Sequence, residues 1–148
     1  MLIDDSLYLI IQEHLPIACV DLLIKYNGKI LLLRRDNEPA KGEFWFPGGR
    51  ILKNETIRTA ALRKAKEETN LNCQFEKIIS VEESLFKKRN LMRTDIHTIN
   101  VCCLLTANDL HHLRLDEFHS DYKWIDKIDS DYHEAVINPL LLFGFMKS

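Results

Sequence analysis

Apolar and polar residues alternate along the chain in stretches typical of short strands and amphipathic helices. Residues 17–26 and 29–35 are mostly apolar and are joined by Asn27–Gly28, a pair that favours a hairpin turn. The segment before Pro16 begins with cap-type residues and ends at the proline, as a short helix does. These patterns predict helices at 4–15, 55–69 and 134–147, strands at 17–26, 29–35, 72–84, 95–107 and 122–126, and polar loops at 35–44, 86–93 and 108–121.

The order of these elements predicts a mixed sheet sandwiched between helices, an α/β or α+β fold. We expect the last helix to be broken at Asn138–Pro139, because a residue before proline disfavours helical geometry. The sequence contains no repeat, linker or low-complexity segment, and 148 residues suffice for one domain with a real core. Residues 1–148 are therefore predicted to form a single domain.

Composition narrows the range of partners. The formal net charge of −2 gives no global attraction to nucleic acid or to an anionic membrane. The longest apolar run, residues 140–145, is too short to span a bilayer, and the acidic N-terminus lacks the basic region of a secretory signal. None of the four cysteines has C-x-x-C spacing, and neighbours 102 and 103 point to opposite faces of a strand. We expect reduced thiols and a cytoplasmic location.

Two acids lie on the side of helix 55–69 that should face the core. With residue 55 at zero and about 100° per residue, the small apolar residues cluster between roughly 140° and 280°. Glu67 falls at about 120°, Lys64 at about 180° and Glu68 at about 220°. Because an unpaired buried carboxylate is unfavourable, both acids need a partner. Either Lys64 pairs with both, or both hold a hard divalent cation together with carbonyls of the preceding glycine turn.

The segment from residue 48 to 71 resembles the Nudix box, G-x5-E-x7-R-E-U-x-E-E-x-G-U, where U is a bulky aliphatic residue. The positions that agree in register are Gly49, Glu55, Arg63, Glu67, Glu68 and Leu71. The resemblance implies a Nudix fold, with a loop–helix–loop that brings the Gly48 or Gly49 carbonyl near the helix carboxylates. It also implies that Glu55, in the first turn of the helix, and Arg63 act as braces that orient the acids.

Two residues depart from the box. Asn70 replaces a glycine, and asparagine tolerates the left-handed conformation that ends helices. Lys64 replaces a glutamate that is usually a metal ligand, so one carboxylate is lost and one ammonium is gained. We therefore expect one Mg²⁺ rather than two or three. An inert protein with the Nudix fold is the alternative.

Residues 17 to 126 are similar to one branch of the family, the GDP-mannose mannosyl hydrolases, which attack the anomeric carbon of the sugar and work with a single Mg²⁺. The likeness includes Asp21, the pair Arg34–Arg35, the Pro-Ala-x-Gly loop, Arg50 after the double glycine, and the segment DEFHSDYKW. It implies a nucleoside diphosphate sugar as substrate, GDP-mannose or GDP-glucose first, and a homodimer formed through the N-terminal part.

The resemblance also implies roles for individual residues. His119 is the base that activates water, a task that suits a group titrating near neutrality. Arg35 and Arg50 stabilise the departing diphosphate with their forked donors, and Asp21 contacts the substrate. The Mg²⁺ ligands are Glu68, the Gly48 carbonyl and Glu67, so the metal sits on the leaving group.

This branch has two residues that the chain lacks. Phe118 stands where the branch has a glutamine ligand, and Asn100 stands where it has a tyrosine. Conversely, Glu67 is kept here although the branch lost it. Two other readings therefore stay open. One is a Nudix pyrophosphatase that cuts a P–O bond with Glu67 or Glu68, and the other is a catalytically weak module that binds nucleotide sugars.

Several candidates also have ordinary structural readings. His119 and its neighbours His111 and His112 fit a surface loop, and Asp21 fits a buried, hydrogen-bonded acid. Arg34 and Arg35 alternate along a strand, so only one of them can face a pocket. The remaining expectations are that His97 is a strand residue, that residues 86–93 form a solvated loop tip and that Trp45 and Trp124 belong to the core.

Overall fold

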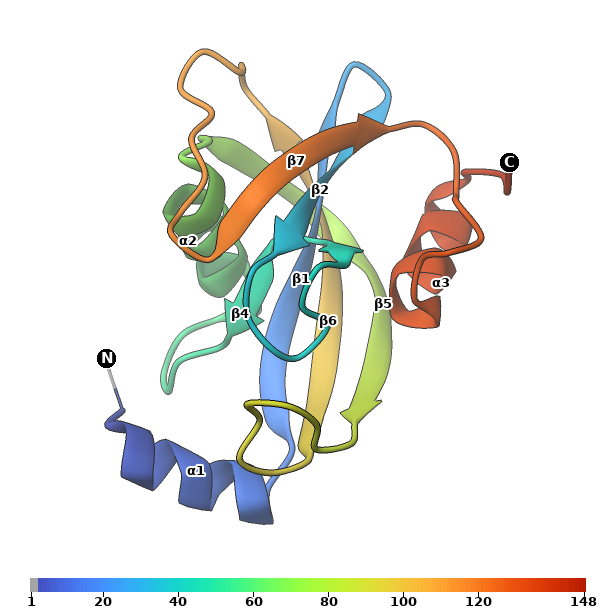
Figure 1. The fold of residues 1–148 in the computed structure, drawn as a ribbon. Coiled ribbons are helices and arrows are strands. Elements are labelled where there is room, and N and C mark those ends of the chain that lie inside the picture. The colour runs from blue at the N-terminus through green and yellow to red at the C-terminus, as the bar shows by residue number, and fades with distance from the viewer. Residues whose placement is uncertain (1–2) are drawn as a thin grey trace.

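The computed structural model describes residues 3–148 and contains three helices and seven strands among them (Figure 1). The helices are α1 (Asp5–His14), α2 (Ile57–Thr69) and α3 (Glu134–Phe143). The strands are β1 (Ile17–Tyr26), β2 (Lys29–Arg35), β3 (Phe44–Trp45), β4 (Gly48–Arg50), β5 (Cys73–Phe86), β6 (Ile96–Ala107) and β7 (His119–Ile125).

The seven strands form one mixed sheet in which the main path runs β3-β2-β1-β6-β5. β1 and β6 are parallel, whereas β1 pairs with β2 through the predicted hairpin in antiparallel fashion. β4 also pairs with β1, and β7 pairs with β2. The register between β2 and β7 shifts at Arg34/Arg35, and this irregularity places Arg35 opposite His119.

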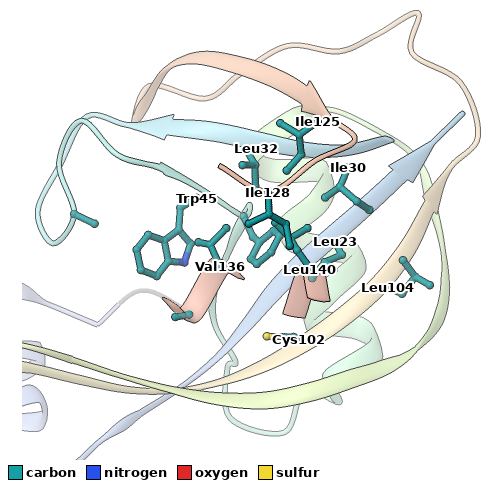
Figure 2. Close-up of a cluster of buried hydrophobic side chains, with 13 residues drawn as sticks. Leu23, Ile30, Leu32, Trp45, Cys102, Leu104, Ile125, Ile128, Val136 and Leu140 are labelled. Carbon is teal, nitrogen blue, oxygen red and sulfur yellow. The ribbon is translucent and has the colours of Figure 1, made fainter. Parts of the chain in front are cut away.

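α2 and α3 lie on opposite sides of the sheet (Figure 1) and each covers a separate core. The alanines of α2 pack on one face with Leu22, Leu33 and Cys103. The residues of α3 pack on the other face, where Val136 and Leu140 meet the side chains shown in Figure 2. Cys102 belongs to this second core, so the neighbouring cysteines do face opposite ways. The predicted sandwich of helices around a mixed sheet is confirmed.

Local interactions explain where the site-bearing helix begins and ends. Thr56 is the N-cap of α2, and its hydroxyl accepts a hydrogen bond from the Thr59 amide at 3.1 Å. The predicted start at residue 55 is therefore wrong by two residues, and Glu55 lies before the helix rather than in its first turn. Asn70 ends α2 in the left-handed conformation at φ 58°, as its side chain permits.

Other expectations need correction. α3 is not broken at Asn138–Pro139 but continues to Phe143 with Pro139 inside it. Pro139 is buried, as are Val136 and Leu140 on the same side of α3, and this packing outweighs the local preference against helix. The short strands β3 and β4 were not predicted, because two or three residues show no periodicity. β7 begins at His119, three residues before the predicted start.

α1 lies apart at one end of the sheet, near the ends of β1 and β6 (Figure 1). None of the residues of α1 is buried. Within the described part of the chain, no helix has both the length and the apolar character that crossing a bilayer requires.

Candidate active site

Glu68 is the most buried charged residue of α2, with 7% of its surface exposed. One carboxylate oxygen accepts a hydrogen bond from the Gly48 amide at 2.9 Å, and the other lies 3.2 Å from the Lys64 ammonium. Burial raises the pKa of Glu68, and Lys64 and the Gly48 amide oppose that rise. Position 48 requires glycine, because a Cβ there would lie 2.1 Å from the Val20 carbonyl oxygen.

Lys64 runs along the backbone of Gly49 and reaches both acids. A Cβ on Gly49 would lie 2.6 Å from the Lys64 Cε, so the glycine makes room for the lysine side chain. The Nζ atom lies 3.2 Å from a carboxylate oxygen of Glu67 and 3.2 Å from one of Glu68. The acids were expected to pair either with Lys64 or with a divalent cation, and the Lys64 ammonium is in contact with both Glu67 and Glu68.

Arg63 joins the helix to the loop before it. Its Nε and Nη2 donate to the two carboxylate oxygens of Glu55 at 2.6 and 2.9 Å, and Nη2 also donates to the Arg50 carbonyl at 3.0 Å. Its Nη1 donates to Glu67 at 3.1 Å. The Glu67 side chain remains 50% exposed. Glu55 and Arg63 therefore occupy bracing positions, although Glu55 braces from the loop.

The ion pair between Glu55 and Arg63 makes stability depend on pH. The hydrogen bond from Arg63, helped by the Leu52 amide, lowers the pKa of Glu55 from 4.5 to about 2. The folded state therefore releases this proton more readily than the unfolded chain. The resulting stabilisation is complete above about pH 4.5 and is lost as pH falls towards 2.

We expect Glu55→Gln to lower the free energy of unfolding by about 2 kcal/mol at pH 7 and by much less at pH 2.5. Urea unfolding at both pH values measures the difference, and Glu13→Gln on the exposed face of α1 is the control. An equal loss at both pH values would show that the charge on Glu55 is not the source of its effect.

His119 and Asp116 lie beside the Glu68 carboxylate. The His119 ring is 5% exposed, and its Nδ1 lies 2.6 Å from an Asp116 carboxylate oxygen. One ligand-type atom from each of Glu68, Asp116 and His119 lies within 4.8 Å of the other two. The loop is tied to the end of α2, since the Asp116 amide donates to the Glu68 carbonyl at 3.2 Å. This arrangement offers oxygen and nitrogen ligands to a divalent cation, or an oriented imidazole as a base.

A pocket of about 300 Å³ adjoins this group, because Gly48, whose amide donates to Glu68, is one of its lining residues. Arg35 lines it, whereas Arg34 points to solvent, as the alternation along β2 required. Burial lowers the pKa of Arg35, and the carboxylates of Glu68 and Asp21 oppose that change. Arg50 also lines the pocket, with its guanidinium 4.2 Å from the centre of the Tyr8 ring.

Asp21 lies on the pocket wall and is 5% exposed. Its carboxylate accepts a hydrogen bond from the Asn100 amide at 3.1 Å, and Asn100 in turn accepts one from the Thr98 hydroxyl at 2.6 Å. Burial raises the pKa of Asp21 to about 7, against the hydrogen bonds from Asn100 and Trp45. The acid is therefore both hydrogen-bonded and part of a pocket wall.

The other candidates lie outside this group. His97 is a strand residue whose Nε2 lies 2.9 Å from a Glu83 carboxylate oxygen. His111 and His112 are in the loop before β7, and Phe118 is 49% exposed. Trp45 belongs to one core and Trp124 packs against the other.

Sequence reasoning did not single out Asp116 or Ser84. Asp116 lies in the segment DEFHSDYKW that pointed to His119, and a catalytic base is often oriented by a further polar group. Ser84 had none, since a serine in a half-polar strand is common. Only the pairing of β5 with β6 brings it to the pocket.

The chain folds as a mixed sheet between helices, and a glycine loop leads into the helix that carries the acids. A comparison of the chain with models of known protein families identifies the class to which it belongs. The model described as the NUDIX domain matches residues 15–137. The chain therefore belongs to the Nudix family, and the predicted fold class is that of this family. Nudix proteins of the hydrolase type use divalent metals and small-molecule substrates.

Individual relatives agree with this assignment. The chain is 34% identical to the low-salt glycan biosynthesis protein Agl8 of Haloferax volcanii, over 82% of this chain and 78% of that one. It is 41% identical to an ADP-ribose pyrophosphatase of Methanocaldococcus jannaschii, over 47% of this chain and 41% of that one. A MutT NUDIX hydrolase from Burkholderia pseudomallei shares the fold, with a TM-score of 0.71, 20% identity and coverage of 87% and 98%.

Proposed function

We propose that this protein is a Mg²⁺-dependent hydrolase of a nucleoside diphosphate sugar, with water attacking the anomeric carbon and the nucleoside diphosphate departing. The observation that carries the proposal is the position of the Asp116–His119 pair beside Glu68, next to a pocket lined by Arg35 and Arg50. The relative named for glycan biosynthesis supports a substrate that contains a sugar.

The residues present fit one divalent cation. The carboxylate oxygens of Glu68 and Asp116 lie within 4.8 Å of each other, and hard cations favour such oxygens. The Lys64 ammonium, 3.2 Å from Glu68, takes the place of a further ligand and adds a positive charge. We assign Glu68 and the Gly48 carbonyl as ligands of a single Mg²⁺, with Glu67 at the edge of the site. A bound Mg²⁺ supplies positive charge to the diphosphate leaving group.

His119 is the base in this proposal. With its Nδ1–H donated to Asp116, the other ring nitrogen has a free lone pair that can accept a proton from water. Asp116 fixes this tautomer and stabilises the imidazolium that forms, as an orienting acid does in other base–acid pairs.

Arg35 and Arg50 assist departure of the diphosphate, because their guanidinium groups present several fixed donors to phosphate oxygens. Both line the pocket, as does Gly48, whose amide donates to Glu68. Both arginines are partly buried, and partial exclusion of water strengthens their interaction with the charge that develops as the bond breaks.

The test is a panel of nucleotide sugars, beginning with GDP-mannose and GDP-glucose, incubated with and without Mg²⁺ and followed by identification of the products. Free sugar and nucleoside diphosphate, formed only with Mg²⁺, are expected. Binding without Mg²⁺-dependent turnover across the panel would instead make the protein a recognition module.

A Nudix pyrophosphatase that attacks phosphorus is the second candidate. This candidate is favoured by Glu67, which the mannosyl hydrolase branch lacks. It is also favoured by the relative that is named an ADP-ribose pyrophosphatase. In this case the products of the same panel are a nucleoside monophosphate and a sugar phosphate.

We infer that Lys64→Glu will raise the number of Mg²⁺ ions bound from one to two. The new carboxylate would lie beside Gly49 and between Glu67 and Glu68, where oxygen ligands converge. Isothermal titration with Mg²⁺ measures the stoichiometry, and Lys66→Glu on the exposed side of α2 is the matched control. If stoichiometry stays at one in both variants, Lys64 does not occupy a ligand position.

The resemblance to the mannosyl hydrolase branch also leads us to propose a cytoplasmic homodimer. Leu7 and Ile10 of α1 and its C-cap Leu15 are exposed, and a subunit interface would cover such a surface. Light scattering coupled to size-exclusion chromatography distinguishes a dimer from a monomer.

A further inference from the structure

One end of the pocket has a wall of small polar side chains. Thr98 and Asn100 are two residues apart in β6, so their side chains lie on the same face of the sheet. Ser84 of β5 pairs directly with Thr98. Asp21 of β1 completes the wall, since it receives the Asn100 amide. All four residues line the pocket, while the same sheet face becomes apolar towards Leu23 and Leu104.

Ser84 is the unusual member of this wall. Its side chain is 2% exposed, and its hydroxyl has no hydrogen-bond partner among the described residues 3–148. Buried polar groups are nearly always paired, because leaving one unpaired destabilises the folded state. The Thr98 hydroxyl donates to Asn100 and the Asn100 amide donates to Asp21, and neither group bonds to Ser84.

We propose that Ser84, together with Asp21 and Asn100, forms a recognition subsite for the glycosyl ring of the substrate and that Ser84 is a specificity-determining residue. This inference rests on the proposed function, which places a nucleotide sugar in the pocket. A sugar ring carries hydroxyls that each donate and accept, so one ring satisfies the Ser84 hydroxyl and the Asp21 carboxylate together.

The test compares affinity for GDP-mannose with affinity for GDP, measured by calorimetry with Ca²⁺ in place of Mg²⁺. For Ser84→Ala we expect affinity for GDP-mannose to fall about tenfold and affinity for GDP to change less than about twofold. The melting temperature of this variant should equal or exceed that of the wild type, because the removed hydroxyl has no partner. Ser80→Ala, which removes a hydroxyl of β5 bonded to Glu82, is the control and should leave both affinities unchanged.

Three results would overturn the subsite: equal losses for both ligands, an unchanged affinity for GDP-mannose, or a wild-type protein that binds GDP-mannose no more tightly than GDP. Equal losses would place the nucleoside, not the sugar, against Ser84. A Ser84-dependent preference for GDP-mannose without turnover in Mg²⁺ would keep the subsite and contradict the proposed hydrolase. If GDP-mannose is turned over with Mg²⁺ but its affinity does not depend on Ser84, the proposed hydrolase stands and the subsite is contradicted.

Discussion

His119→Gln is expected to lower kcat by about 10²–10⁴-fold while KM and the affinity for Mg²⁺ change little. Glutamine keeps a polar side chain of similar length but has no basic nitrogen that can accept a proton from water. The ring of His119 is 5% exposed and bonded to Asp116, so it is held in position before any substrate binds. Steady-state kinetics with the best substrate of the panel, together with Mg²⁺ titration, measures these quantities.

His111→Gln is the matched control, because His111 lies in the same loop but is exposed. This change should leave kcat unaffected. A His119→Gln protein with normal kcat would remove His119 as the base. A loss of Mg²⁺ affinity that parallels the loss of kcat would make His119 a ligand, as its distance from Glu68 and Asp116 also permits.

Glu68→Gln is expected to lower kcat by about 10³-fold and to weaken Mg²⁺ binding by at least about 100-fold. The amide keeps the shape of the side chain but loses its negative charge. Glu68 is 7% exposed and faces Lys64 at 3.2 Å, so the variant also leaves a largely buried ammonium with one partner fewer. Mg²⁺ titration and kinetics give the two effects separately.

Glu67→Gln provides the comparison within the same helix. Its carboxylate is half exposed and already held by Arg63 and Lys64, so we expect a loss below about tenfold in both quantities. If the two variants lose activity equally, the acids act as one unit. If Glu67→Gln loses more activity than Glu68→Gln, then Glu67, not Glu68, is the more important of the two acids.

The sequence was sufficient for the elements that carry a strong periodic or turn signal. The hairpin at Asn27–Gly28, the long strands and α2 follow from local preferences that agree with the tertiary structure. The inward position of Glu68 could also be derived from helical periodicity alone. Glu67, at the edge of the same stripe, is half exposed, and its carboxylate is bonded to Arg63.

What the sequence could not supply depends on contacts between distant segments. The approach of Asp116 to Glu68 results from a loop tied to the end of α2, and the position of Ser84 results from strand pairing. Pro139 inside α3 shows the same limit, since tertiary packing overrides a strong local preference. β3 and β4 are too short to carry any pattern.

Hydrolysis of GDP-mannose with Mg²⁺ in ¹⁸O-labelled water tests the central claim most directly, because the label reports which atom water attacks. Mass spectrometry of the products should find ¹⁸O in the free mannose and unlabelled GDP. Label in a phosphate group, with mannose phosphate and GMP as products, would contradict attack at the anomeric carbon.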